Sequence, residues 1–594
     1  MESKPFRQGV PSLLVKTPKV RTISFGSVLI FCWLPFRMSA QGLESTPSPD
    51  AGDVVRPSAS PVPSQASPQP SATATPGAGA SQSKTFAEAF RHGWDAAGAG
   101  RYSDAIVEYT QAIQLKPNDA VIYNDRGIAY SALRQYAQAI EDFTEAIRLK
   151  PDLAEAYNDR GNAYGALRQH QQAIADYTEA VRLKPGFVQA YYNRALNYGA
   201  LKKYDEDIAD CNAVIYLKVD FPNAYFERGN VSYTLGHFNE AIADYNQTIY
   251  LSPSAEAYNN RGNAYRALQQ YNFAMTDYTE AIRLKPDFAE AYANRAYVYS
   301  AIKVPEKAVL DYSEALRIKP DFAEAYYARA TANVSLSRYD DAITDYTEAI
   351  RLSPDLARAY FSRALIFDQL ERYDEAIADY SEVVRLAPDS VEGYSNLGRD
   401  CLALMKYEKA ISSYNEVIRL KPDLAVAYGN RAVAYDAMNL YDDAIGSCNE
   451  AIRLKPDYAE GYYIRGRVYR MLQQYDKAIS NCSEAIRLKP DYADAFYNRA
   501  AASSALKRYD ASIADYTEAI RLKADFAEAY HGRGQAYNLL RQYDKAVADF
   551  SEAIGLRANF TEAYESRASA YEALGEKEKA RADFNQVIGL QNKR

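Results

Sequence analysis

The chain has 594 residues, a formal net charge of −8 and an aromatic share of 13% that comes mostly from 52 Tyr. The part after residue 85 has 61 basic and 73 acidic side chains. Because neutralising phosphates needs a basic surface, this balance excludes a general nucleic-acid binder, and we expect no nucleic-acid partner.

Residues 1–42 resemble a targeting segment. Basic residues precede an apolar run over residues 23–36, and small residues follow at Ser39 and Ala40. This order is typical of a secretory signal peptide, and the run is shorter than the roughly 20 residues of a membrane helix. An uncleaved membrane anchor stays open as the alternative. We therefore expect an exported protein, periplasmic or extracellular, with membrane tethering through residues 23–36 if the segment is kept.

Residues 43–85 form a segment of different composition, with 8 Pro, 9 Ser, 7 Ala and no aromatic residue. Such a sequence buries too little apolar surface to offset the entropy of ordering it. We interpret it as a disordered linker.

Residues 86–594 consist of one unit of 34 residues repeated fifteen times, with one unit of 33 residues at 222–254. Pro117, Pro151 and Pro185 mark the period. Within each unit, apolar and small residues recur at steps of three and four in two separate stretches, which predicts two helices. Since one such pair cannot bury its own apolar faces, neighbouring units must pack on each other.

This pattern resembles the tetratricopeptide repeat family. The resemblance implies an all-α, right-handed superhelical solenoid of antiparallel helix pairs, in which the first helices line a concave groove. The family's clamp for chaperone C-terminal carboxylates needs Lys and Arg in the groove, and this sequence has Glu, Asn, Asp, Tyr or Ser there, so we do not expect that ligand. The residues that carry the family signature in one unit are Tyr157, Gly161, Tyr164, Ala173, Tyr177, Ala180 and Pro185.

One departure from the family pattern is systematic. Thirteen units have Arg just before the small residue of the first helix, and eleven have Asp just before the aromatic residue of the second, as in Arg295 and Asp311. Since an Arg near an interface needs a partner, we predict an Arg–Asp ladder with a structural role. Arg431 and Arg465 face Ser447 and Asn481 instead, which leaves partners from adjacent units open.

Acidic residues at the start of the first helices have a capping-box spacing. In six units a Glu follows an Asp by three residues, as in Asp152 and Glu155. We therefore expect these residues to cap helices rather than to bind a ligand.

The sequence shows no catalytic constellation and no metal-spaced Cys or His pair, so we expect no enzymatic activity and no cofactor. Cys211, Cys401, Cys448 and Cys482 replace core residues and are predicted to be buried free thiols. In the last unit, charges at 576–579 and Arg581 predict a polar cap that prevents end-to-end polymerisation.

The candidate binding site is the groove lined by the first helices. Asn side chains can bind a peptide backbone through donor and acceptor groups, as in the asparagine ladder of some family members, and aromatic side chains can anchor an apolar residue. The alternative is that these Asn residues only face water. The predicted groove residues are Asn158, Asn162, Asn193, Asn259, Asn260, Asn263, Asn294, Tyr327, Phe361, Asn396, Asn430, Tyr463, Tyr497 and Asn498.

The sequence therefore predicts a non-catalytic scaffold that binds protein or peptide segments in its groove. A second hypothesis is architectural: the array is a spacer or assembly platform that makes contacts through its outer face and ends. Mutation of the groove separates the two, because only peptide recognition depends on it.

Overall fold

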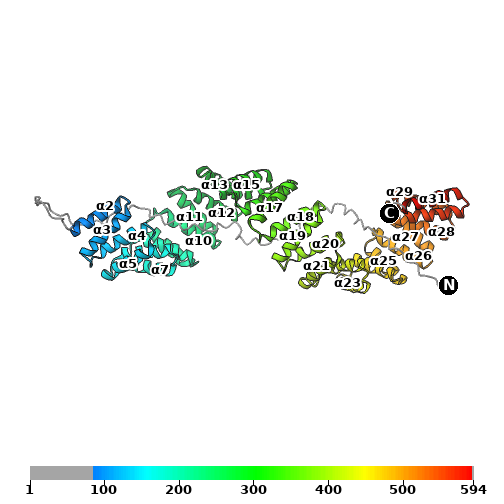
Figure 1. Ribbon diagram of the computed structural model, residues 1–594, viewed down its shortest axis with the longest axis horizontal. Helices are drawn as coiled ribbons and strands as arrows, with labels where there is room; N and C mark the ends of the chain where they lie inside the picture. The colour runs from blue at the N-terminus through cyan, green and yellow to red at the C-terminus, as the bar shows by residue number, and fades with distance from the viewer. Residues whose placement is uncertain (1–83, 592–594) are drawn as a thin grey trace. The chain divides into compact units, whose positions relative to one another are not determined.

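The computed structural model describes residues 84–591, which form thirty helices in tandem pairs and contain no strand. The predicted signal or anchor at 1–42 and nearly all of the predicted linker lie outside the described residues. The all-α solenoid of helix pairs is confirmed, and Figure 1 shows the pairs in chain order.

The described residues divide into two compact units, 84–345 and 346–591, and the division falls within α17 (Tyr339–Leu352). The first unit contains α2 (Phe86–Gly98), α3 (Tyr102–Leu115), α4 (Ala120–Ala132), α5 (Tyr136–Leu149), α6 (Ala154–Ala166), α7 (His170–Leu183), α8 (Val188–Ala200), α9 (Tyr204–Leu217), α10 (Pro222–Thr234), α11 (Phe238–Leu251), α12 (Ala255–Ala267), α13 (Tyr271–Leu284), α14 (Ala289–Ala301), α15 (Pro305–Ile318) and α16 (Ala323–Ser335). The second contains α18 (Ala357–Gln369), α19 (Tyr373–Leu386), α20 (Val391–Ala403), α21 (Tyr407–Leu420), α22 (Ala425–Ala437), α23 (Tyr441–Leu454), α24 (Ala459–Met471), α25 (Tyr475–Leu488), α26 (Ala493–Ala505), α27 (Tyr509–Leu522), α28 (Ala527–Leu539), α29 (Tyr543–Leu556), α30 (Thr561–Ala573) and α31 (Lys577–Gln591).

The turn inside each pair is a Schellman motif. Between α6 and α7, the Arg168 N–H donates to the Gly165 carbonyl and the Gln169 N–H donates to the Tyr164 carbonyl, both at 2.9 Å. Arg168 has φ 57°, in the left-handed region that usually selects Gly. Three other repeats have Gly at the equivalent position, namely Gly100, Gly236 and Gly575. The remaining repeats have a non-glycine residue with a positive φ there.

The core of most repeats is an aromatic ring packed on a small residue, and Cys211, Cys448 and Cys482 replace the ring in three of them. Tyr177 on α7 is 2% exposed, and its ring lies 2.8 Å from where a Cβ on Gly161 of α6 would be. Its cluster continues into Ala190 of α8, in the next repeat. The aromatic signature therefore works by nearest-neighbour packing, which is the reason that a single pair is unstable by itself.

The Arg–Asp ladder is confirmed, and it joins repeats as well as helices. Arg160 donates through Nε and Nη2 to both carboxylate oxygens of Asp176 in its own repeat, at 2.8 and 2.7 Å. Its Nη1 donates to Thr144 Oγ1 of the preceding repeat at 3.1 Å. Arg431 follows the same geometry with Ser447 and Asn415, and Arg465 follows it with Asn481 and Asn449.

The capping-box prediction is wrong. The N-cap residues of α6, α14, α16, α24 and α28 are apolar or aromatic and make no side-chain capping bond; the Asp precedes the N-cap by one residue. At α20 the cap is Ser390, not Asp389. In α6, α14, α24 and α28 the first-turn Glu instead pairs with the basic residue that follows the second helix, as in Lys184 Nζ to Glu155 Oε1 at 2.8 Å. The antiparallel pairing brings these two ends together, a contact that local spacing does not reveal.

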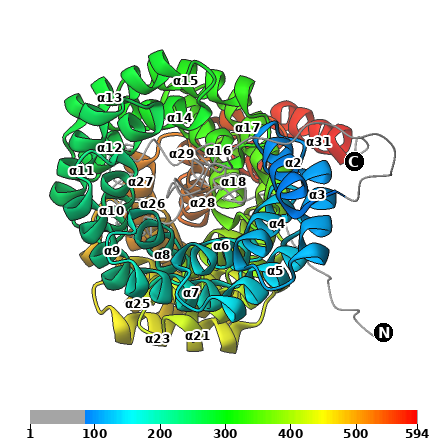
Figure 2. The same ribbon diagram turned by 90° about the vertical axis from the view of Figure 1, so that its left-hand side faces the viewer.

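The first helices form the inner layer of the first unit. Successive first helices, such as α4 and α6, α6 and α8, and α8 and α10, contact each other directly. Figure 2 shows α4, α6, α8, α10, α12 and α14 on the inside of the arc and α5, α7, α9, α11, α13 and α15 on the outside. We call the inward side of these first helices the inner face.

Candidate peptide-binding face

The predicted groove residues all lie on first helices, spread over α6, α8, α12, α14, α16, α18, α20, α22, α24 and α26. None of the fourteen is fully exposed. Asn158, Asn259, Asn263, Asn294 and Asn498 are buried, and the other nine are half-buried. Whether they bind a ligand stays a prediction, but their side chains also have structural partners.

The Asn side chains are joined from repeat to repeat. Asn193 Nδ2 on α8 donates to Asn162 Oδ1 on α6 at 2.8 Å, and Tyr177 Oη donates to the same oxygen at 2.8 Å. Asn294 Nδ2 donates to Asn259 Oδ1 at 3.0 Å. Because an amide has two donor hydrogens and two acceptor positions, these bonds leave hydrogen-bonding capacity on the half-buried members.

The aromatic candidates pack against rings of the protein itself. Ring centroids are 5.7 Å apart for Phe361 and Tyr380, and 4.8 Å apart for Tyr463 and Tyr492. Tyr497 lies between two rings, at 5.7 Å from Tyr516 and 4.9 Å from Phe526. Only part of each ring is therefore open to a ligand, and Tyr327 is also engaged in an interaction.

Three carboxylates occupy the same helical register as Asn193 and are not among the fourteen predicted groove residues. Asp125, Asp159 and Glu227 are on α4, α6 and α10, separated by multiples of the 34-residue period. Burial raises the pKa of Asp125 and of Asp159 to about 7 and also raises that of Glu227. In each case the hydrogen bond that lowers the pKa comes from a neighbouring Asn, at Asn124, Asn158 or Asn230, and not from a cation.

A fourth carboxyl group lies in the core next to Glu227. Asp207 of α9 replaces the Ala found at the equivalent Ala173, and it is fully buried. Its Oδ1 accepts from Cys211 Sγ at 3.4 Å, while its Oδ2 has no hydrogen-bond partner among residues 84–591. Burial, with the nearby charge of Glu227, raises the pKa of Asp207 to about 8.

Asp207 and Glu227 converge on Gly199 of α8. A Cβ at Gly199 would lie 2.6 Å from Asp207 Oδ2 and 3.4 Å from Glu227 Oε1. Any larger residue at Gly199 would therefore displace the Asp207 carboxylate. The signal in the sequence was Asp207 itself, because nearly all other repeats have Ala at this position.

Basic side chains on later first helices differ from these acids because they have internal partners. Arg399 pairs with Asp400 and Asp368, and Arg467 pairs with Asp436. Arg470 Nε donates to Asn498 Oδ1 at 2.9 Å. On α4, α6 and α10, in contrast, Asp125, Asp159 and Glu227 have no cationic partner.

The described residues lack a candidate metal centre. Within residues 84–591, no group of three or more His, Cys, Asp or Glu is arranged to hold a metal ion, and no helix is long and apolar enough to cross a membrane. The four cysteines predicted as buried free thiols are confirmed. Burial raises the pKa of Cys448 and of Cys482 to about 12.

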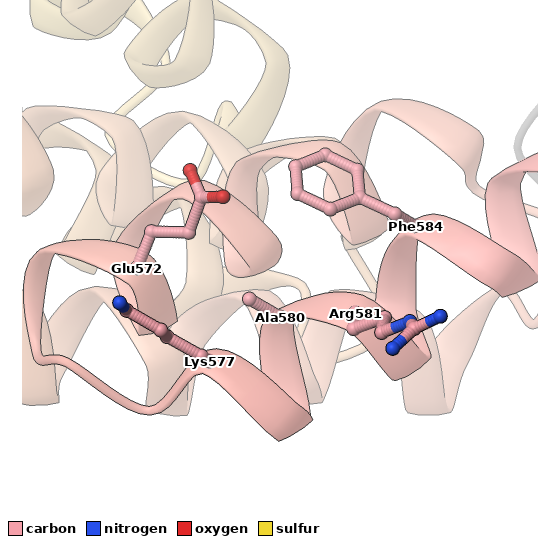
Figure 3. A pocket seen from close by; sticks show the side chains of 5 residues that line it. All are labelled: Glu572, Lys577, Ala580, Arg581 and Phe584. Atoms are coloured by element: carbon pink, nitrogen blue, oxygen red, sulfur yellow. The ribbon is translucent and has the colours of Figure 1, made fainter.

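Two surface pockets lie at the terminal repeats. One, of about 370 Å³, is formed by α30 and α31, and Figure 3 shows Glu572, Lys577, Ala580, Arg581 and Phe584 around it. The last helix thus exposes charged residues, but Phe584 and Ile588 are also exposed on it. That this repeat prevents end-to-end association stays a prediction. The other pocket, of about 480 Å³, lies between α2 and α3.

The arrangement is that of a helical repeat protein of the solenoid class, and comparison with known families agrees. Profiles described as tetratricopeptide repeat or TPR repeat match segments between residues 99 and 594, and the chain belongs to the tetratricopeptide repeat family. The matched residues are 99–134, 120–153, 154–187, 222–254, 262–302, 289–322, 327–391, 391–424, 425–458, 466–506, 504–540, 527–560 and 561–594.

Solved structures with similar folds include MamA, YrrB and yeast Tom70. MamA is 24% identical over 27% of this chain and 95% of its own, with a TM-score of 0.26. YrrB, described as a TPR protein with an unusual peptide-binding site, is 22% identical over 32% of this chain and 98% of its own, with a TM-score of 0.29. Tom70 is 17% identical over 72% of this chain and 96% of its own, with a TM-score of 0.26. No curated protein sequence matches the chain.

Proposed function

We propose that the protein is a non-catalytic interaction scaffold that binds extended peptide or protein segments on the first helices. The observation that carries this proposal is the row of amides that continues from repeat to repeat, as from Asn162 to Asn193. Asn162 Oδ1 accepts from two donors, which fixes the orientation of the amide and leaves its Nδ2 group as the part that can donate to a ligand carbonyl. Peptide-binding relatives such as YrrB are consistent with this use of the fold.

We further propose that the protein acts in the cell envelope or outside the cell, directed there by residues 1–42. The basic and apolar order of that segment supports this location. Fractionation of source cells, followed by N-terminal sequencing of the recovered chain, tests it. Recovery from the cytosol with Met1 intact would refute export.

The groove test compares matched changes of Asn residues. Asn193, Asn396 and Asn430 are half-buried and lie at one register of the first helices, so changing them to Ala alters the face without opening the core. The control changes the exposed Asn118, Asn239 and Asn272 to Ala; Asn239 and Asn272 lie on second helices.

The full chain and both variants are used to capture proteins from envelope and secreted fractions, after equal helicity and melting are established. We expect partners of the parent to be lost from the inner variant and kept by the control. Equal capture by all three proteins would refute recognition by the first helices.

The architectural alternative has one specific observation in its favour. Tyr216 and Tyr250, on the outer helices α9 and α11, are 90% and 81% exposed. Most other repeats have Arg at this position, paired with Glu three residues earlier, as in Arg182 and Glu179. Changing both Tyr to Arg gives these repeats the residue that most others have at this position. If this variant loses the captured partners while the variant of Asn193, Asn396 and Asn430 keeps them, contacts through the outer helices are favoured.

A further inference from the structure

The inner face of α4, α6, α8 and α10 has a chemistry that the proposed function does not specify. Its register residues are Asp125, Asp159, Asn193 and Glu227, so three of four positions have a carboxylate. Burial raises the pKa of each carboxyl because no cation offsets the desolvation of its charged form. Unpaired charges at an inward surface cost stability, and a complementary ligand removes that cost.

A second, independent feature is the buried Asp207 behind Gly199. Its Oδ2 is fully enclosed, lacks a partner among the described residues, and points to the same place as Glu227 Oε1. Because burial raises the pKa of Asp207 to about 8, its carboxyl holds a proton at neutral pH, and the half-buried Glu227 is the member of the pair that accepts from a ligand. The structure therefore places two carboxyl groups next to Gly199, and no cation lies beside either of them.

From these contacts we propose that the inner face of α4–α10 binds an extended segment of a partner protein through its Lys or Arg side chains. This inference rests on the proposed function and adds the chemistry of the ligand. Asp125 and Asp159 each receive one basic residue, and Glu227, which lies next to the enclosed Asp207, receives a third. Asn193, between them, binds the ligand backbone.

The spacing of the repeats defines the spacing of the basic residues. Helices in direct contact lie about 8–10 Å apart, and α4, α6, α8 and α10 contact each other in that order. A polyproline II segment rises about 3.1 Å per residue and has three residues per turn. One turn therefore spans about 9 Å and presents one side chain per repeat. The expected ligand has a basic residue at every third position.

The test uses defined peptides and the full chain. Four copies of Lys-Pro-Pro form the probe, four copies of Glu-Pro-Pro the charge control, and four adjacent Lys followed by eight Pro the spacing control. Binding is measured by fluorescence anisotropy at low and at physiological salt.

The test variant changes Asp125 and Asp159 to Asn and Glu227 to Gln. Its matched control, Asp205→Asn, Asp220→Asn and Glu141→Gln, removes the same three charges from exposed positions. Because the targeted carboxylates are unpaired, their removal leaves the fold intact, which circular dichroism checks.

We expect the Lys-Pro-Pro probe to bind the parent and the control equally, more weakly at higher salt, and at least tenfold more weakly to the test variant. We also expect it to bind more tightly than both other peptides. Equal binding to the test variant and the parent, or equal binding of the adjacent-Lys peptide, would overturn the proposal.

The capture experiment distinguishes this failure from failure of the proposed function. If partners require Asn193 but the lysine probe does not require the carboxylates, the scaffold function stands and the basic ligand is wrong. If the variant with Asn193, Asn396 and Asn430 changed to Ala captures the same partners as the parent, recognition by the first helices is refuted, independently of how the lysine probe binds.

Discussion

Arg295 and Asp311 form a two-pronged ion pair between α14 and α15. Arg295 Nε donates to Asp311 Oδ2 at 2.7 Å, and its Nη2 donates to Oδ1 at 2.9 Å. The third donor, Nη1, contacts Thr279 Oγ1 of the preceding repeat at 3.2 Å. One guanidinium thus links the two helices of its own repeat and joins them to the preceding repeat.

The first prediction concerns this pair. Arg295→Leu leaves Asp311 buried without a cation, which costs about 3–5 kcal/mol in measured cases. The repeat with Leu397 has Ser413 at the Asp position, so both members are replaced together there. We therefore expect Arg295→Leu with Asp311→Ser to recover most of the stability lost by Arg295→Leu.

Hydrogen exchange of amides in residues 289–322 measures this effect locally, which suits an array whose repeats do not unfold as one. Equal exchange in the single and the double variant would contradict the paired role.

The second prediction concerns Asp207. Its pKa is raised from 3.8 to about 8 in the folded state, so between pH 4 and pH 8 the folded protein holds a proton that the unfolded chain releases. Stability from this group is therefore present at low pH and is lost as pH rises through that window. Asp207→Ala restores the common Ala, and we expect a melting temperature higher than the parent's, by a margin that grows from pH 5 to pH 8.5.

Thermal unfolding followed by circular dichroism tests this at several pH values, with Asp205→Ala on the exposed first turn of α9 as the control. A margin that is constant with pH would show that Asp207 is ionised in the folded protein.

The third prediction concerns His531 on α28. Burial lowers the pKa of His531 to about 4, and Ser566 Oγ lies 3.0 Å from its Nε2. The unfolded chain takes up the proton near pH 6.5, so this group destabilises the fold as pH falls from 6.5 to 4. We expect His531→Gln to lose less stability than the parent over this range. The exposed His237→Gln serves as the control, and parallel losses in both variants would be the contrary result.

The fourth prediction concerns the cysteines. Cys211, Cys401, Cys448 and Cys482 are fully buried, and burial raises the pKa of each thiol. Since the thiolate is the reactive form, we expect these four thiols to stay unlabelled by iodoacetamide in the folded protein and to be labelled completely in urea. Peptide mass spectrometry identifies each site. Rapid labelling of Cys448 or Cys482 in the native protein would show that their repeats open locally.

Much of the fold was accessible from the sequence because its contacts are local or one repeat away. The 34-residue period predicted the helix pairs, and the joint occurrence of Arg and Asp predicted an ion pair. The capping prediction failed because Asp152 and Glu155 were read within one helix, whereas Glu155 pairs with Lys184 at the end of the next. Spacing along a single helix does not identify a partner that antiparallel packing brings near.

For the candidate site, too, the sequence and the tertiary structure each determined a different part. The sequence by itself determined which residues lie on the first helices, since a helical period assigns each side chain to a face. Only the tertiary structure decided which of them are used internally, as Asn294 and Asn259 are, and which charges stay unpaired, as Asp125, Asp159 and Glu227 do. Pairing depends on distances between different helices. Those distances are fixed by the packing of rings such as Tyr177 on residues such as Gly161, not by the periodicity of any one helix.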